Sequence, residues 1–344
     1  MVSDTRQIRN PSPEQILIAI ITGAANFREI LNQLPVLAES DLPVLLRGEP
    51  GTGKELVARA ICALNHRRQP RQVINCASLT ESLAGSELFG HLRGAFTDAR
   101  NYRPGKFLMA NGGNLFLDEI GDLPLSIQAM LLRAVEQGEI EPVGGDKAVK
   151  VDVRLVSATN QDMSRLIAQG LFRQDLYDRL AVLEIFLPPL REREGDVVLL
   201  ARHFAWETAR LYGLNLPVRF TPGALDRLQR HSWPGNVREL KNAISRAVLL
   251  HLGDRITRED IHLNSRGVQV EISARHSSPL AIPVRPSRGR LMELLNEERG
   301  NISSLSRRLK VSTKTLYRWL RSYQIDLENL RDWVSHLNLR LMGE

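Results

Sequence analysis

The sequence predicts an α/β fold in which a parallel sheet carries a phosphate-binding loop, followed by an all-helical region. Three observations predict it. A glycine-rich loop at 48–55, with the letters GEPGTGKE, lies between an apolar strand pattern and a helical pattern. Short apolar strand patterns alternate with helical patterns between residues 15 and 189, which is typical of a parallel sheet covered by helices. From 191 to 263 the patterns are helical, without a convincing strand.

These patterns also divide the chain. We expect a polar tail at 1–14, an α/β domain at 15–189 and a helical lid at 190–264. A proline-containing linker at 265–289 then leads to a helix-turn-helix domain at 290–326 and an amphipathic helix at 327–344. The strands expected in the α/β domain are 44–46, 73–75, 114–117, 153–158 and 183–187.

Composition bounds the function. The 344 residues are enough for two or three domains, and the net charge of +7 is uneven. Twelve Arg and Lys residues stand against seven Asp and Glu residues from Arg285 to the end. This excess indicates a nucleic-acid partner there, although a solvated basic surface remains the alternative.

The two cysteines, Cys62 and Cys76, lie in apolar contexts without metal-ligand spacing. They indicate reduced core residues of a cytoplasmic protein. The apolar run 16–21 is too short to span a bilayer, so no membrane association is expected.

The loop at 48–55 has the chemistry of a nucleotide site. Its glycines allow backbone N–H groups to surround phosphate oxygens, and the following helix adds its dipole. Lys54 can reach the β- and γ-phosphates. The strand 114–117 ends at Asp118 and Glu119, where one acid can hold Mg²⁺ and the other can polarise the attacking water.

Three further places can complete such a site. The strand 153–158 leads into polar residues that can sense the γ-phosphate. Arg173 and Arg179 are surface charges unless a neighbouring subunit presents its nucleotide to them, in which case they stabilise the transferring phosphoryl group. Arg238, in the segment WPGNVREL, can reach over the nucleotide from the lid.

The ensemble resembles the bacterial enhancer-binding proteins, the AAA+ activators of sigma-54 RNA polymerase. The matching stretches are GEPGTGKELVARAI, NCASL, SELFGHLRGAFTDA, GGNLFLDEIGDLP, RLVSATN, FRQDLYDRL, LPPLRERE and WPGNVRELKN. Their order and spacing carry the resemblance, which runs from about residue 16 to 263 and resumes in the C-terminal segment. Another AAA+ machine, such as an unfoldase or a replication loader, would lack the helix-turn-helix and the GAFT loop.

The resemblance implies ATP and Mg²⁺ as cofactors and a role for each matching residue. Asn75 corresponds to the asparagine that restrains the catalytic Glu119, and Arg173 and Arg179 correspond to arginine fingers of a hexameric ring that also has a dimeric form. Thr159 and Asn160 match the first sensor, and Arg238 matches the second. Glu55 stands where a general phosphate loop has Ser or Thr, so Mg²⁺ depends more on Asp118. The implied nucleotide-binding residues are Gly48, Glu49, Gly51, Thr52, Gly53, Lys54, Glu55, Ile21, Gly23, Thr159, Asn160 and Arg238.

One departure from the family concerns the loop that contacts sigma-54. The family reads GAFTGA, whereas this chain has Gly94, Ala95, Phe96, Thr97, Asp98 and Ala99. Asp98 adds a charge and removes the backbone freedom of glycine, and Leu92 stands where the family commonly has an acid. Two functions therefore stay open, a sigma-54 activator and a DNA-binding regulator or repressor that no longer couples to sigma-54.

A second departure is that only a short tail precedes the ATPase, so we expect control by a regulator acting in trans, by expression level or by the loop itself.

The C-terminal end resembles the helix-turn-helix of the factor-for-inversion-stimulation type and implies double-stranded DNA as a partner. The heptad-like leucines of 327–344 indicate a helix that either pairs two DNA-binding domains or packs on its own. In the helix-turn-helix domain, Leu291, Leu294 and Leu295 indicate a first helix, and after a break at Gly300 we expect a second helix at 302–309 and a third at 312–323. The candidate DNA contacts on the third helix are Thr313, Lys314, Thr315, Arg318 and Arg321.

Overall fold

The computed structural model describes residues 20–67, 71–96, 99–214, 218–250, 255–263, 286, 288–298, 300–309, 311, 313–323 and 325. The chain divides into two compact units, Met1–Gly267 and Val268–Glu344, and each is described by itself. The expected tail 1–14, most of the expected linker 265–289 and the expected helix 327–344 lie outside the described residues.

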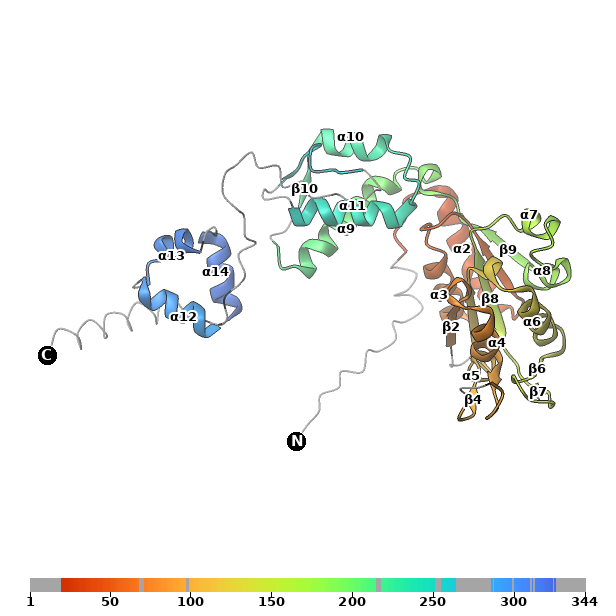
Figure 1. Cartoon of the computed structure of the whole chain (residues 1–344). Coiled ribbons are helices and arrows are strands. Elements are labelled where there is room, and N and C mark those ends of the chain that lie inside the picture. The colour runs from red at the N-terminus through yellow and green to blue at the C-terminus, as the bar shows by residue number, and fades with distance from the viewer. Residues whose placement is uncertain are drawn as a thin grey trace. The chain divides into compact units, whose positions relative to one another are not determined.

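A five-stranded parallel sheet forms the centre of the first unit, with the strand order β2-β5-β8-β1-β9 (Figure 1). Each strand begins and ends within two residues of the sequence prediction. The fold class predicted from the sequence is therefore confirmed. The strands are β1 Val44–Arg47, β2 Arg71–Asn75, β5 Asn114–Asp118, β8 Arg154–Thr159 and β9 Leu183–Phe186.

The register of the sheet brings the carboxyl ends of its strands together. Asn75 pairs with Asp118 across β2 and β5, and Arg47 pairs with Thr159 across β1 and β8. Because all five strands are parallel, the polar residues that follow them meet at one edge of the sheet. This edge is where the candidate site lies.

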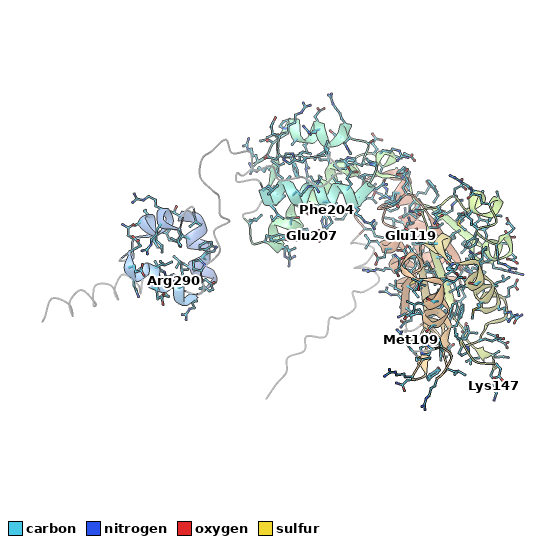
Figure 2. The ribbon with its side chains drawn as sticks, viewed as in Figure 1. Met109, Glu119, Lys147, Phe204, Glu207 and Arg290 are labelled. Carbon is cyan, nitrogen blue, oxygen red and sulfur yellow. The ribbon has the colours of Figure 1, made fainter. Side chains whose placement is uncertain are left out.

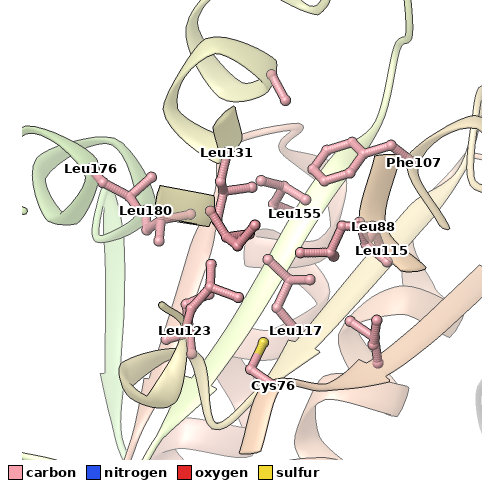
Figure 3. Packing of buried hydrophobic residues seen from close by; sticks show 14 of the residues in the cluster. Cys76, Leu88, Phe107, Leu115, Leu117, Leu123, Leu131, Leu155, Leu176 and Leu180 are labelled. Atoms are coloured by element: carbon pink, nitrogen blue, oxygen red, sulfur yellow. The ribbon is translucent and has the colours of Figure 1, made fainter. Parts of the chain in front are cut away.

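Two hydrophobic cores cover the two faces of the sheet. Leu45, Leu117 and Leu155 point into a core shared with α4 (Glu81–Phe89), α6 (Leu125–Gln137) and α8 (Gln174–Leu180), as Figure 3 shows for many of its members. Val44 and Phe116 point to the opposite face, toward α2 (Ala25–Glu39) and α3 (Lys54–Leu64). The alternation follows from the two-residue period of a strand.

Both cysteines are free and buried, Cys62 in the second core and Cys76 in the first, as the sequence predicted. Burial raises the pKa of the Cys62 thiol to about 11 and that of Cys76 to about 12. Both thiols therefore stay protonated at neutral pH, and they act as small apolar core residues.

Short elements that the sequence did not predict flank the sheet. The strands β3 (Gly90–His91) and β4 (Arg103–Pro104) form one antiparallel pair, and β6 (Glu139–Ile140) and β7 (Val149–Lys150) form another. Strands of two residues are too short to show a hydrophobic period. Two further α-helices of this part are α5 (Lys106–Met109) and α7 (Met163–Ala168).

The lid consists of α9 (Asp196–Leu211), α10 (Pro222–Arg230) and α11 (Asn236–Leu250) around a core that includes the fully buried Trp233. The Trp233 indole Nε1 donates to the carbonyl of Leu228 at 2.8 Å. The expectation of no strand here is corrected, because β10 (Arg219–Phe220) pairs in parallel with β11 (Arg255–Ile256). This two-residue bridge joins segments that flank α10 and α11.

The second unit contains α12 (Arg288–Glu297), α13 (Ile302–Arg308) and α14 (Thr313–Ser322). Gly300, with φ of 75°, separates the first two helices, and the Asn301 side chain caps α13 by accepting from the Ser304 N–H at 3.0 Å. These three helices lie where the sequence predicted them. Their shared core comprises Leu291, Leu294, Leu295, Leu305, Leu316, Trp319, Leu320 and Ile325.

Candidate functional site

The phosphate loop connects β1 to α3 and is closely packed. Gly51 has φ of 79°, and a Cβ atom there would lie 2.5 Å from the carbonyl oxygen of Gly235, so only glycine fits. Lys54 is buried, and its ammonium donates to the carbonyl oxygen of Gly48 at 2.8 Å and, more weakly, to that of Glu49 at 3.4 Å. The Lys54 ammonium thus lies across the inside of the loop.

Two carboxylates face this cation from the end of β5. Burial raises the pKa of both Asp118 and Glu119, while the charge of Lys54 opposes the shift in each case. Burial also lowers the pKa of Lys54, against the attraction of Glu119 and Asp118. In Figure 2, Glu119 lies at the end of the sheet that faces the lid, whereas Met109 and Lys147 lie toward the opposite end.

Glu119 is held in an unusual conformation. Its φ of 52° is left-handed, which is uncommon for a residue with a long side chain and is found mostly at turns and functional sites. Its carboxylate accepts a hydrogen bond from the backbone N–H of Asn160 at 3.2 Å. The Asp118 carboxylate accepts from the Glu119 N–H at 3.1 Å. The turn therefore aims both acids toward the loop.

The donor set fits Mg²⁺ bound together with nucleotide phosphates. Within the ranges that the structure describes, no three His, Cys, Asp or Glu side chains gather into a cage. Magnesium at phosphate sites needs only one or two carboxylates, with phosphate oxygens and water filling the other positions. The half-buried Asp118 beside the phosphate loop meets that requirement.

Asn75 and Thr159 lie at the ends of the strands beside β5. The Asn75 side chain accepts from the Ala77 N–H at 2.9 Å, and the Thr159 hydroxyl accepts from the Gln161 N–H at 3.1 Å. In this structure the bond to the Glu119 carboxylate comes from the Asn160 backbone. The structure thus brings Asn75, Thr159 and Asn160 to the acids, as expected from the parallel strands.

The lid makes direct contact with the phosphate loop. The Glu49 carboxylate pairs with Arg191 at 2.7 Å and accepts from the Asn236 amide at 3.0 Å, and these two partners lower its pKa. The Glu49 side chain therefore faces the lid. Arg238 packs against Gly51, since a Cβ at that glycine would lie 3.1 Å from the Arg238 Cβ.

Glu55 is exposed and forms an ion pair with Arg59 one turn along α3.

Ile21 packs on the lid core, and the segment after it is bound to the first residue of α9. The buried carboxylate of Asp196 accepts from the Thr22 hydroxyl at 2.8 Å and from the Gly23 N–H at 2.6 Å. Sequence reasoning missed Asp196, whose only local signal is an acid at a helix start.

Arg173 and Arg179 lie on the exposed surface at α8 rather than among the acids that follow β5. Arg173 precedes the helix and pairs with Asp175 at 2.7 Å, and Arg179 pairs with Glu136 at 3.0 Å. Both guanidinium groups are well exposed. Their positions leave them available to another molecule.

The loop that carries the GAFTDA segment lies beside β3 and the β6–β7 hairpin. The Gly94 N–H donates to the Ala99 carbonyl at 2.7 Å, which closes the loop, and the Phe96 ring meets the His91 ring edge-on at 5.0 Å. Leu92 and Val143 are joined by a backbone hydrogen bond at 3.1 Å, so the hairpin supports the base of the loop. Thr97 and Asp98 lie outside the described residues.

Among the candidate DNA contacts, Thr313 is exposed at the start of α14. The side chains of Lys314, Thr315, Arg318 and Arg321 lie outside the described residues.

The parallel sheet, the phosphate loop, the acids after β5 and the helical lid together define an AAA+ P-loop NTPase fold. Residues 20–186 match the family model of the sigma-54 interaction domain, and residues 191–277 match that of the AAA+ ATPase lid domain. In the part of the chain that the structure describes, no helix has the length and apolar character needed to cross a membrane.

Comparisons with individual proteins agree with these matches. The chain is 44% identical over 290 residues to the transcriptional regulatory protein ZraR of Klebsiella oxytoca, covering 84% of this chain and 65% of that protein. Identity to ZraR of Salmonella typhimurium strain LT2 is 41% over 307 residues, covering 89% and 69%. The fold is similar to the crystal structure of NtrX from Brucella abortus in complex with ATP, with a TM-score of 0.65, 32% identity and coverage of 88% and 69%.

The chain therefore belongs to the family of sigma-54-dependent AAA+ transcriptional regulators, which confirms the resemblance drawn from the sequence. It spans about two thirds of the length of these curated relatives.

Proposed function

We propose that this protein hydrolyses ATP and uses the energy to remodel sigma-54 RNA polymerase at promoters that it reaches by binding DNA. The observation that carries the proposal is the meeting of Lys54, Asp118 and Glu119 at the carboxyl edge of the sheet, next to the phosphate loop. A regulator that acts on RNA polymerase and DNA works in the cytoplasm.

In the proposed reaction, Lys54 leaves the Gly48 carbonyl and binds the β- and γ-phosphates. Glu119 polarises the attacking water, and Asn160 holds its carboxylate in place. Asp118 would hold Mg²⁺, which neutralises phosphate charge when it is bound. Asn75 restrains Glu119 until nucleotide is bound, and Thr159 and Arg238 act as the first and the second sensor. Ile21 and Gly23 contact the nucleobase.

The arginines at α8 support a ring in which each site is completed by a neighbour. We propose that Arg173 and Arg179 enter the nucleotide site of the adjacent subunit in a hexamer, which the chain reaches from a dimeric form. Arg173→Ala is expected to lower ATP turnover by about 10³-fold or more while leaving ATP binding intact. Steady-state ATPase assays and calorimetric titration with ATP measure the two quantities.

A mixing experiment separates a role in trans from a local one. Subunits with Arg173→Ala keep Glu119, and subunits with Glu119→Gln keep the arginine, so a mixed ring contains complete sites. Mixing the two inactive variants should restore part of the activity, and no recovery would contradict the role in trans. Arg230→Ala, which removes an exposed lid arginine paired with Asp226, is the matched control and should keep normal turnover.

Transcription in vitro tests the remodelling function. The full chain with sigma-54 polymerase and ATP should form open promoter complexes, and Asp98→Gly, which restores the family glycine, should increase their number. If the natural chain forms none, while Asp98→Gly forms them, the alternative of an uncoupled regulator or repressor is correct. If neither forms them under conditions where both hydrolyse ATP, sigma-54 remodelling is rejected.

Binding to double-stranded DNA should depend steeply on salt. Each lysine or arginine that neutralises a phosphate releases counterions, so the logarithm of affinity falls by about 0.9 per contact for each tenfold rise in salt. Replacing Lys314 and Arg318 by alanine should make this slope less steep by about 0.9 to 1.8, which corresponds to the loss of one or two phosphate contacts. Fluorescence anisotropy over a salt series measures it, and a flat response of the natural chain would refute the assignment of the C-terminal helices.

A further inference from the structure

The lid holds the outer side of the phosphate loop at three consecutive carbonyl groups. The Asn236 amide donates to the Pro50 oxygen at 3.1 Å, and the Val237 N–H donates to the Gly51 oxygen at 3.0 Å. The Arg193 guanidinium donates to the Thr52 oxygen at 2.7 Å. Thus three successive peptide groups of the loop take their orientation from residues of the lid.

The orientation of a carbonyl decides where the next N–H points. In a trans peptide the C=O and the following N–H point in opposite directions, because the peptide group is planar. A carbonyl drawn outward to the lid therefore turns the next N–H toward the inner side of the loop. For the Thr52 carbonyl that N–H belongs to Gly53, the residue before Lys54. Inward N–H groups are what binds phosphate oxygens in such loops.

Three contacts hold the Arg193 side chain in place, to Pro188, to Phe27 and to Thr52. It is only 3% exposed, its Nε donates to the Pro188 carbonyl at 2.9 Å, and its guanidinium lies 3.9 Å from the centre of the Phe27 ring. Burial lowers its pKa to about 10, so it remains charged at neutral pH. A buried charge is costly to retain unless its hydrogen bonds are made, and here they go to the end of the sheet and to the phosphate loop.

We propose that Arg193 is a positioning residue for phosphate binding, and that it acts by orienting the peptide group between Thr52 and Gly53, with Asn236 as its partner at Pro50. The inference rests on the proposed nucleotide function. Its consequence is that the lid sets the shape of the phosphate loop, so any movement of the lid is transmitted directly to the phosphate site. Neither residue needs to touch the nucleotide for this.

The test compares ligands with and without phosphates on the full-length protein. Calorimetric titration with ADP should show about ten- to hundredfold weaker binding for Arg193→Gln, the range expected for one hydrogen bond to a charged group. Competition by adenosine against a fluorescent ADP analogue should show unchanged adenosine affinity. Arg193→Lys keeps the positive charge but has a single donor nitrogen. Its ADP affinity should lie between that of the natural chain and that of Arg193→Gln.

Asn236→Gly supplies an independent variant. Asn236 has φ of 52°, which glycine adopts without strain, so the change removes the amide contacts and keeps the backbone. Asn236→Gly should also lower the affinity for ADP while leaving the affinity for adenosine unchanged. The matched control is Arg154→Lys, because Arg154 is 1% exposed and donates to the Leu37 and Ala38 carbonyls at the end of α2, away from the loop.

The outcomes are distinct. Selective loss of ADP affinity in Arg193→Gln and Asn236→Gly, with the Arg154→Lys control unaffected, supports the inference. Equal weakening of ADP and adenosine, or unchanged ADP affinity in a folded Arg193→Gln protein, overturns it. Failure of the natural chain itself to bind ADP and ATP would instead reject the proposed function on which the inference rests.

Discussion

Glu119→Gln is expected to bind ATP with nearly natural affinity and to hydrolyse it about 10²- to 10⁴-fold more slowly, the usual contribution of a general base. The amide keeps the size of the side chain but cannot accept a proton from water. Single-turnover hydrolysis and calorimetric titration with ATP measure the two effects. Normal turnover in this variant would show that another group activates the water.

The electrostatic surroundings of Glu119 add a pH test. Burial raises its pKa above the ordinary value of 4.5, and it must be ionised to act as a base. As pH falls through the raised pKa, the base becomes protonated and kcat/KM should drop, so the acid limb should lie above pH 4.5. The limb should be absent from the residual activity of Glu119→Gln.

The matched control is Glu207→Gln, the same isosteric change at an exposed lid residue that pairs with Lys241 at 3.0 Å. Figure 2 shows Glu207 among the lid helices, apart from Glu119. It should hydrolyse ATP at the natural rate.

Lys54→Ala should abolish ATP binding, with at least about a hundredfold loss of affinity, because charge-assisted hydrogen bonds to phosphate are strong. The ammonium is the charge that already lies inside the loop, bound to the Gly48 carbonyl, and alanine leaves the loop with no cation at that point. Without it, the phosphates would meet Asp118 and Glu119 uncompensated. Calorimetric titration with ATP and with ADP measures the loss.

The matched control is Lys241→Ala, which removes an ammonium that pairs with Glu207 on the lid surface. This variant should bind ATP with unchanged affinity. Natural affinity in Lys54→Ala would contradict the assignment of the loop at 48–55 as the phosphate site. Loss of binding in both variants would point to a general effect of removing positive charge.

Local patterns determined a large part of this protein. The apolar runs before Gly48 and Asp118 predicted β1 and β5, because a strand buried on both faces needs several adjacent apolar residues whatever surrounds it. The loop at 48–55 and the acids after β5 predicted candidate roles for Lys54, Asp118 and Glu119, since each of these two motifs is short and continuous in sequence. The three helices of the second unit followed equally from local signals, such as the break at Gly300.

Tertiary structure alone decided what surrounds these residues. Asp196 reaches Gly23, Arg193 reaches Thr52 and Asn236 reaches Pro50 across long separations in sequence, and any side chain with a suitable donor or acceptor can make such contacts. The partner of a backbone carbonyl leaves no pattern in the sequence, because every residue has a carbonyl. The sequence by itself therefore determined the fold and the proposed reacting groups, whereas the attachment of the lid to the phosphate loop depends on how the chain packs.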